Sequence, residues 1–104
     1  MSILMEILQE ELDRLERQEA AYSADLQELP KGYISKKNIR GKESYYLQYR
    51  DGQKIRSQYV SAKDLPELEE QIRRGKRLKE SLRRVKDDQK KLRKVLRGNN
   101  ERSI

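Results

Sequence analysis

The sequence predicts an α+β fold in which an antiparallel two-helix coiled-coil hairpin carries a three-stranded antiparallel meander inserted at its connecting end. Two observations lead to this prediction: apolar residues recur at heptad spacing near both ends of the chain, and the middle alternates in polarity between glycines. Of the 104 residues, 34% are hydrophobic and 41% are charged. A coiled-coil helix needs only two apolar positions in seven, so it suits this composition better than a thick globular core. We expect one domain over residues 1–98 and a flexible tail over 99–104.

The first helix is predicted over residues 2–29. Its apolar residues are separated alternately by four and three positions if Glu19 occupies one position of the seam. The predicted seam consists of Met1, Met5, Leu8, Leu12, Leu15, Glu19, Tyr22, Leu26 and Leu29. Pro30 ends the helix, because it disfavours the helical conformation at the preceding residue and lacks a backbone N–H.

The meander is predicted over residues 33–60. Its three strands are expected at 33–39, 44–50 and 53–60. We expect a three-residue loop at 50–52 with Gly52 left-handed, so that Leu47 faces Ile55 across the second hairpin. One face of the sheet is then apolar and holds Tyr45, Leu47, Tyr49, Ile55 and Tyr59. The opposite face is polar and holds Tyr46, Gln48, Arg50, Lys54, Arg56, Gln58 and Val60, together with either Lys36 or Lys37.

The second helix is predicted over residues 64–97, with Asp64 or Ser61 as its cap and Pro66 in its first turn. Gly98 is expected to end it. Its seam consists of Leu65, Leu68, Ile72 and Gly75, followed by Leu78, Leu82, Val85, Gln89, Leu92 and Leu96.

The two seams also predict how the helices pair. If the two helices have similar lengths and both begin next to the meander, Leu12 lies beside Leu82 or Val85. The same arrangement places Glu19 opposite residues 75–79, where a glycine leaves space and a lysine can pair with the carboxylate.

Charge is distributed unevenly along the chain. Residues 1–30 contain eight acids and two arginines (−6), residues 31–62 eight bases and two acids (+6), and residues 63–97 fourteen bases and seven acids (+7). Opposite charges on the two helices favour their antiparallel register. The sheet has no acidic partner of its own, so its surplus of bases predicts a polyanionic partner.

Catalysis is not predicted, and we assign no catalytic residue, cofactor or metal ligand. The chain has neither Cys nor His, which removes disulfides, thiolate metal sites and the usual general base. No apolar stretch approaches the roughly 20 residues of a membrane span. We therefore expect a cytoplasmic protein that does not enter a membrane.

The basic strand face and the basic second helix predict a non-enzymatic module that binds DNA or RNA. Lysine and arginine neutralise phosphates, and tyrosine offers a flat stacking surface. If the ribbon enters the major groove, Gln48 and Gln58 are suited to adenine. The predicted binding residues are Lys36, Lys37, Tyr46, Gln48, Arg50, Lys54, Arg56, Arg73, Arg74 and Arg77.

Two stretches of the middle third are distinctive: Leu29-Pro-Lys-Gly-Tyr-Ile-Ser-Lys-Lys37 and Gly41-Lys-Glu-Ser-Tyr-Tyr-Leu-Gln-Tyr-Arg-Asp-Gly-Gln-Lys-Ile-Arg-Ser-Gln-Tyr-Val60. They resemble a family of small bacterial and phage domains of unknown function, which implies a Tyr-rich hairpin between helical flanks but no activity. More loosely, three strands followed by Ala62-Lys-Asp-Leu-Pro-Glu-Leu-Glu-Glu70 resemble the arm-binding domain of tyrosine integrases. That resemblance implies a sheet in the DNA major groove, with Arg50 and Arg56 as the matching bases.

Two alternatives stay open. The chain is also compatible with a phage- or plasmid-encoded inhibitor of a nucleic-acid-processing enzyme, such as an anti-CRISPR protein, whose basic surface docks where nucleic acid normally runs. Ile3, Leu4 and Ile7, which lie beside the first seam, favour a docking surface of this kind. The other alternative is a homodimer formed through the helices.

Overall fold

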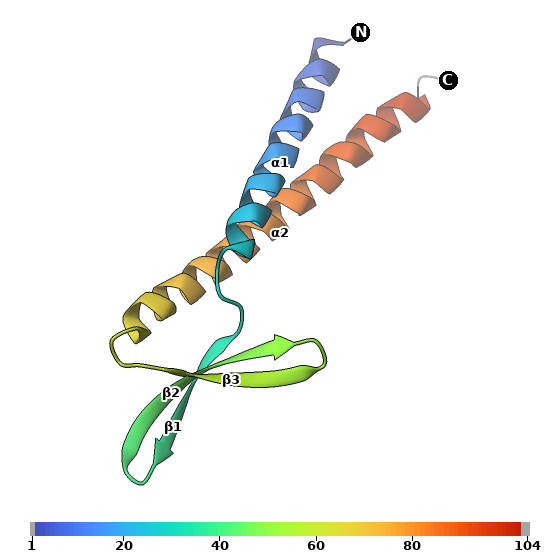
Figure 1. Cartoon of the computed structure of the whole chain (residues 1–104). Coiled ribbons are helices and arrows are strands. Elements are labelled where there is room, and N and C mark those ends of the chain that lie inside the picture. Colours follow the sequence, from blue (N-terminus) through green and yellow to red (C-terminus); the bar gives the residue numbers. More distant parts are fainter. Residues whose placement is uncertain (1, 103–104) are drawn as a thin grey trace. The chain divides into compact units, whose positions relative to one another are not determined.

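The chain folds as two helices that flank a three-stranded antiparallel sheet, which confirms the predicted α+β class. The computed structural model describes residues 2–102, with side chains as far as Gly98. In chain order the elements are α1 (Ile3–Gln27), β1 (Tyr33–Ile39), β2 (Lys42–Asp51), β3 (Lys54–Val60) and α2 (Leu65–Arg102) (Figure 1). None of the helices in the described part combines the length and the apolar character needed to cross a membrane.

The elements belong to two structural units. One consists of α1 as far as Leu26 together with α2 from Leu78 onward, and the other consists of Gln27–Arg77. The second unit therefore contains the whole sheet and the first turns of α2.

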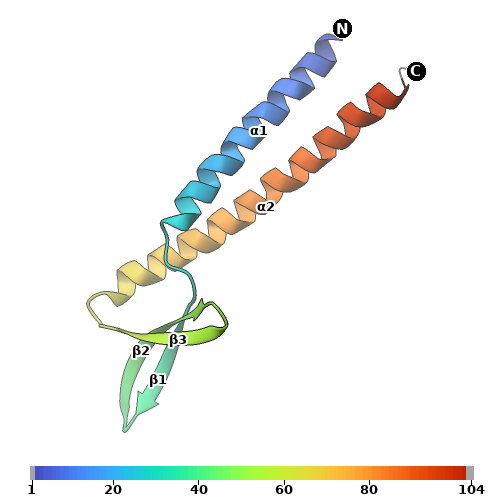
Figure 2. The same ribbon diagram turned by 45° about the vertical axis from the view of Figure 1, so that its right-hand side comes forward.

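The helix-pair unit is held by the predicted heptad seams. Leu12 and Leu15 of α1 and Val85 of α2 are buried, and the remaining seam positions of this unit from Met5 to Leu96 are half-buried or buried. The two helices run side by side in opposite directions, so the start of α1 lies at the same end of the pair as the end of α2 (Figure 2). Gln89, only 1% exposed, donates a hydrogen bond of 3.1 Å from Nε2 to the backbone carbonyl of Leu15.

The register of the helix pair differs from the predicted one. Leu15 lies level with Gln89, and Arg93 pairs with Glu16 at 3.4 Å. Leu12 therefore does not lie beside Leu82 or Val85, and Glu19 is shifted in the same way from the expected level of residues 75–79. The displacement is about two to three helical turns. The predicted register assumed that both helices start level with the meander, whereas the part of α2 that shares a unit with α1 begins at Leu78.

The helix ends also differ from the predicted ones. α1 ends at Gln27, two residues before the predicted end. Glu28 already forms a turn, ahead of Leu29, the residue whose helical conformation Pro30 disfavours. α2 continues to Arg102 instead of stopping at Gly98, so residues 99–102 are helical and not a loose tail. Gly98 keeps a negative φ and so does not form the left-handed C-terminal cap that was expected of it. The last two residues of the predicted tail lie outside the described residues.

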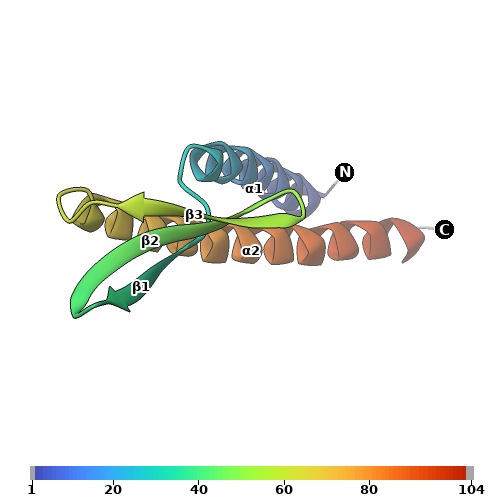
Figure 3. The ribbon, with the colours of Figure 1, turned by 60° about the horizontal axis from the view of Figure 1, so that its bottom comes forward.

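The sheet has the order β1-β2-β3, with the long strand β2 at its centre (Figure 3). Both hairpins close through two-residue turns. In the first, Arg40 and Gly41 both have positive φ, 55° and 78°, as a type I′ turn requires. In the second, Gly52 has a φ of 65° and is followed by Gln53 without positive φ, as in a type II′ turn.

The register of the second hairpin corrects the predicted one. Asp51 pairs with Lys54, Arg50 with Ile55 and Tyr46 with Tyr59, so the predicted three-residue loop and the predicted pairing of Leu47 with Ile55 are wrong. Gly52 is left-handed as expected, but it is the first residue of the loop and not the last. Because side chains alternate along a strand, this difference moves every residue of β3 to the opposite face.

Glu19 is a half-buried residue of the α1 seam, where an apolar side chain would stabilise the helix pair. We predict that Glu19→Leu raises the free energy of unfolding by about 1 kcal/mol, since it buries part of a leucine without leaving a polar group unpaired. Thermal unfolding followed by circular dichroism should show a melting temperature higher by roughly 4–8 °C. Glu10→Leu, at an exposed position off the seam, is the matched control and should change it little. A melting temperature unchanged or lowered by Glu19→Leu would remove Glu19 from the seam.

Candidate nucleic-acid interface

The two faces of the sheet follow from the strand pairing. Residues that pair across antiparallel strands share a face, and neighbours along a strand point to opposite faces. One face, here called the open face, holds Tyr33, Ser35, Lys37, Ile39, Lys42, Ser44, Tyr46, Gln48, Arg50, Ile55, Ser57 and Tyr59. The other, the packed face, holds Ile34, Lys36, Asn38, Glu43, Tyr45, Leu47, Tyr49, Asp51, Lys54, Arg56, Gln58 and Val60.

The packed face contains the buried apolar residues of the sheet, Leu47 and Val60. It also contains both carboxylates of the strands, and each of them forms an ion pair there. Lys36 lies 2.9 Å from Glu43, and Arg56 lies 2.6 Å from Asp51. The hydrogen bond from Lys36 to Glu43 raises the pKa of the Lys36 ammonium. These pairs are largely exposed, so they neutralise charge more than they stabilise the fold.

The open face has the opposite electrostatic character. Lys37, Lys42 and Arg50 are its cations, and within the sheet, all of which is described, no carboxylate lies on this face. None of the three cations forms an ion pair with a side chain of the described residues 2–98. Their charge therefore remains available to an external anion.

The predicted binding residues of the sheet are divided between the two faces. Lys37, Tyr46, Gln48 and Arg50 lie together on the open face. Lys36, Lys54 and Arg56 lie on the packed face, as does Gln58. The predicted polar face is therefore wrong as a set, and the choice left open between Lys36 and Lys37 is resolved: Lys37 is the lysine beside Tyr46.

Aromatic side chains form the centre of the open face. The hydroxyl of Tyr33 donates a hydrogen bond to Oε1 of Gln48, its partner across the strands. The rings of Tyr46 and Tyr59 meet edge to face, with centroids 5.8 Å apart and an interplanar angle of 74°. The ammonium of Lys37 lies 4.9 Å from the centroid of the Tyr46 ring, within cation–π range. These contacts hold a row of rings and a cation against the sheet.

Sequence reasoning missed several residues of the open face. Tyr59 and Ile55 were assigned to the apolar side, although they are 62% and 69% exposed. Tyr33 and Lys42 were not among the predicted binding residues. The signal that identifies Ile55 and Tyr59 is Gly52 at the first position of the two-residue turn between β2 and β3, which is typical of type II′ hairpins.

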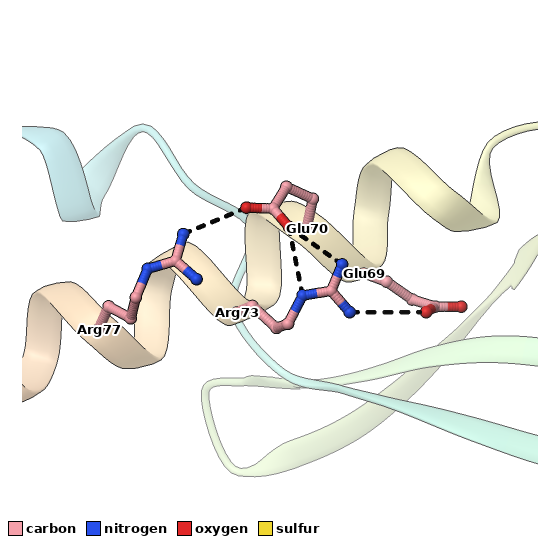
Figure 4. Close-up of polar contacts among 4 residues, drawn as sticks. All are labelled: Glu69, Glu70, Arg73 and Arg77. Carbon is pink, nitrogen blue, oxygen red and sulfur yellow. Dashed lines mark hydrogen bonds and ion pairs between the residues drawn. The ribbon is translucent and has the colours of Figure 1, made fainter.

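The three predicted arginines of α2 are mostly occupied by neighbouring acids (Figure 4). Arg73 contacts Glu69 at 3.9 Å and Glu70 at 3.0 Å, while Arg77 contacts Glu70 at 3.1 Å. Figure 4 shows the Glu70 carboxylate between the two guanidinium groups. Arg74 is the only one of the three without an ion pair inside the described part of the chain.

A groove beside the packed face has a different chemistry. Its lining combines apolar residues, three acids, two glutamines and one tyrosine: Leu29, Pro30, Leu47, Val60, Leu68, Glu28, Asp64, Glu67, Gln58, Gln71 and Tyr59. No lysine or arginine is among its described lining residues, so it does not suit a phosphate. No three acidic side chains within the described residues gather as a candidate metal site.

The comparison with protein families matches residues 5–70 to the model of a domain of unknown function, DUF6788. The match covers more than half of the chain. The chain belongs to this family. The DUF6788 region contains nearly all of α1, the entire sheet and the first six residues of α2, so the open face lies within it, and Arg73, Arg74 and Arg77 lie beyond it. No curated protein and no solved structure matches the chain significantly. The similarity to the tyrosine-integrase domain therefore stays a prediction.

Hydrogen bonds from Arg73 and Arg77 lower the pKa of the Glu70 carboxyl below its ordinary value. Because the folded pKa is depressed, the stabilisation is fully present above the unfolded pKa and is lost as the pH falls through the folded one. We predict that Arg73→Ala with Arg77→Ala returns the Glu70 pKa towards its ordinary value in an NMR titration of the side-chain carboxyl carbon. Glu11, whose pKa is lowered by Arg14, is the internal control and should not change. An unaltered Glu70 pKa in the double variant would contradict the pairing shown in Figure 4.

Proposed function

We propose that this chain is a non-enzymatic module that binds nucleic acid through the open face of its sheet. The observation that carries the proposal is the separation of charge between the two faces. The acids of the strands pair with Lys36 and Arg56 on the packed face, and the cations of the open face have exposed tyrosines as neighbours instead of carboxylates. A surface that combines unneutralised bases with aromatic rings is typical of proteins that bind nucleic acid.

Binding proceeds by neutralisation of phosphates and release of condensed counterions. Three phosphate contacts, one for each cation of the open face, predict a slope of about −2 to −3 in a plot of log K against log salt. Affinity from charge alone is therefore modest, and it falls as salt rises.

The basic part of α2 supplies a further phosphate-binding surface. Arg83, Arg84 and Arg93 are engaged by acids, but Lys90, Lys91 and Lys94 are exposed and form no ion pair within the described residues. These lysines add sequence-independent attraction to a polyanion.

We predict that Lys37→Ala with Arg50→Ala weakens nucleic-acid binding and makes the salt slope less steep by about 0.7–0.9 for each phosphate that is no longer neutralised. Fluorescence polarisation with a labelled mixed-sequence oligonucleotide, titrated from ~50 mM salt upward, measures both quantities.

The matched control removes two cations from the packed face. Lys36→Ala with Arg56→Ala lowers the net charge by the same amount, but it deletes bases that are already paired with Glu43 and Asp51. Affinity should be nearly unaltered in this control. Equal decreases in affinity in both double variants would show that only total charge matters, and the absence of binding at ~50 mM salt would refute the proposal.

A second candidate function is inhibition of a nucleic-acid-processing enzyme by docking against it, as an anti-CRISPR protein does. It is favoured by one observation: Ile3, Leu4 and Ile7 are all exposed, although they lie together near the start of α1. Exposed apolar clusters mark protein-interaction sites. Capture of the enzyme by the chain in nuclease-treated samples, abolished by Ile3→Asp with Ile7→Asp, distinguishes this function from nucleic-acid binding.

A further inference from the structure

We infer that the polymer bound by the open face is an unpaired strand of nucleic acid, whose bases stack on the rings of Tyr33 and Tyr59. This inference rests on the proposed function and names the form of nucleic acid that the same site selects. Three properties of the surface support it: which rings are accessible, how they are spaced and what a duplex can offer them.

Tyr33 and Tyr59 are accessible because the fold does not use them as core. They are 57% and 62% exposed, while the buried apolar side chains of the sheet, Leu47 and Val60, point to the other face. Their orientation is nevertheless restrained. Tyr33 is tethered through its hydroxyl to Gln48, and Tyr59 is held edge to face against the half-buried Tyr46. A ring that is exposed but restrained loses little conformational entropy when a base stacks on it.

The two rings are spaced for separate bases. Tyr33 lies on one edge strand and Tyr59 on the other, in adjacent rows of the open face. Two strand spacings across the sheet and one two-residue step along it put their Cα atoms roughly 12 Å apart. A distance of this size separates bases that are not stacked on each other. An extended single strand that crosses the sheet diagonally reaches both rings.

The cations of the open face border the aromatic residues. Arg50 is the next residue after Gln48 on the open face of β2, and Lys37 lies diagonally from Tyr46. Positive charges are therefore available on both sides of the rings. Ile55, opposite Arg50, adds an exposed apolar surface that offers nothing to a phosphate but contacts a base. The face therefore places its base-binding rings between phosphate-binding cations.

A duplex cannot use this surface in the same way. Its bases stack on one another, so a tyrosine ring reaches a base face only after unstacking it. The residues suited to reading a major groove are also not together, because Gln48 lies on the open face and Gln58 on the packed face. Gln48 in addition accepts the hydrogen bond from Tyr33. A duplex thus meets only the three cations, whereas an unpaired strand meets the cations and the rings.

The preference for an unpaired strand is measurable because the affinity from base stacking adds to that from the phosphate contacts, which a duplex shares. Loss of a base–aromatic stack costs roughly 5- to 140-fold in affinity, which is about 1–3 kcal/mol per base. Three phosphate contacts are shared by both forms of nucleic acid. Even one stack at the weak end of this range gives a clear preference for the unpaired strand.

The test uses the full chain and three labelled probes of the same sequence, about 12 nucleotides long: single-stranded DNA, single-stranded RNA and the DNA duplex. Fluorescence polarisation at ~50 mM salt gives Kd for each. The variants are Tyr33→Ala with Tyr59→Ala, and Tyr33→Phe with Tyr59→Phe, which keeps the rings and deletes only the hydroxyls. Circular dichroism melts establish whether each variant is folded. If the Ala pair does not fold, the Phe pair, which keeps both rings, is compared with the unmodified chain.

We expect single strands to bind at least about tenfold more tightly than the duplex, the Ala pair to abolish this preference, and the Phe pair to keep it. The DNA and RNA probes should both show the effect, because every base has a stacking face. Equal or tighter binding of the duplex, reduced by Lys37→Ala with Arg50→Ala, would overturn this inference and leave the proposed function standing. Absence of binding to all three probes would overturn the proposed function as well.

Discussion

The surface chemistry of this chain depends on one backbone constraint, the two-residue turn that joins β2 to β3. Gly52 takes the left-handed conformation at the first position of the turn, and this makes Asp51 and Lys54 the last pair of the ladder. A side chain with a Cβ is strained at a φ of 65°, so glycine fixes where the loop begins. Sliding the loop by one residue would exchange the faces of all of β3.

The separation of charge in the sheet is a consequence of that turn and of the first one. The turn at Arg40–Gly41 places Glu43 diagonally from Lys36, and the turn at Gly52 places Asp51 diagonally from Arg56. Both acids of the sheet therefore form ion pairs on the packed face. The open face is left with cations and exposed tyrosines, and the proposed binding of nucleic acid rests on this combination.

Much of the fold was predictable from residue spacing, since the seams of the helices and the existence of three strands follow from periods of about 3.5 and 2. The heptad positions from Met5 to Leu26 and from Leu78 to Leu96 are all half-buried or buried, as expected. What was not predictable is register. Asp-Gly before Gln53 permits more than one loop, and the heptads alone do not determine how far α1 slides along α2. The candidate site depends on register more than on element boundaries, so Lys54 and Arg56 were assigned to the wrong face although their strand was identified correctly.

The register of the second hairpin can be measured directly in solution. A NOESY spectrum of the isotope-labelled chain should show cross-peaks between the rings of Tyr46 and Tyr59, whose centroids lie 5.8 Å apart. In the alternative register, with a three-residue loop, Leu47 would face Ile55, and these two side chains would give cross-peaks instead. Contacts between Tyr46 and Tyr59 support the open face described here. Contacts between Leu47 and Ile55, without any between the two tyrosines, would contradict it.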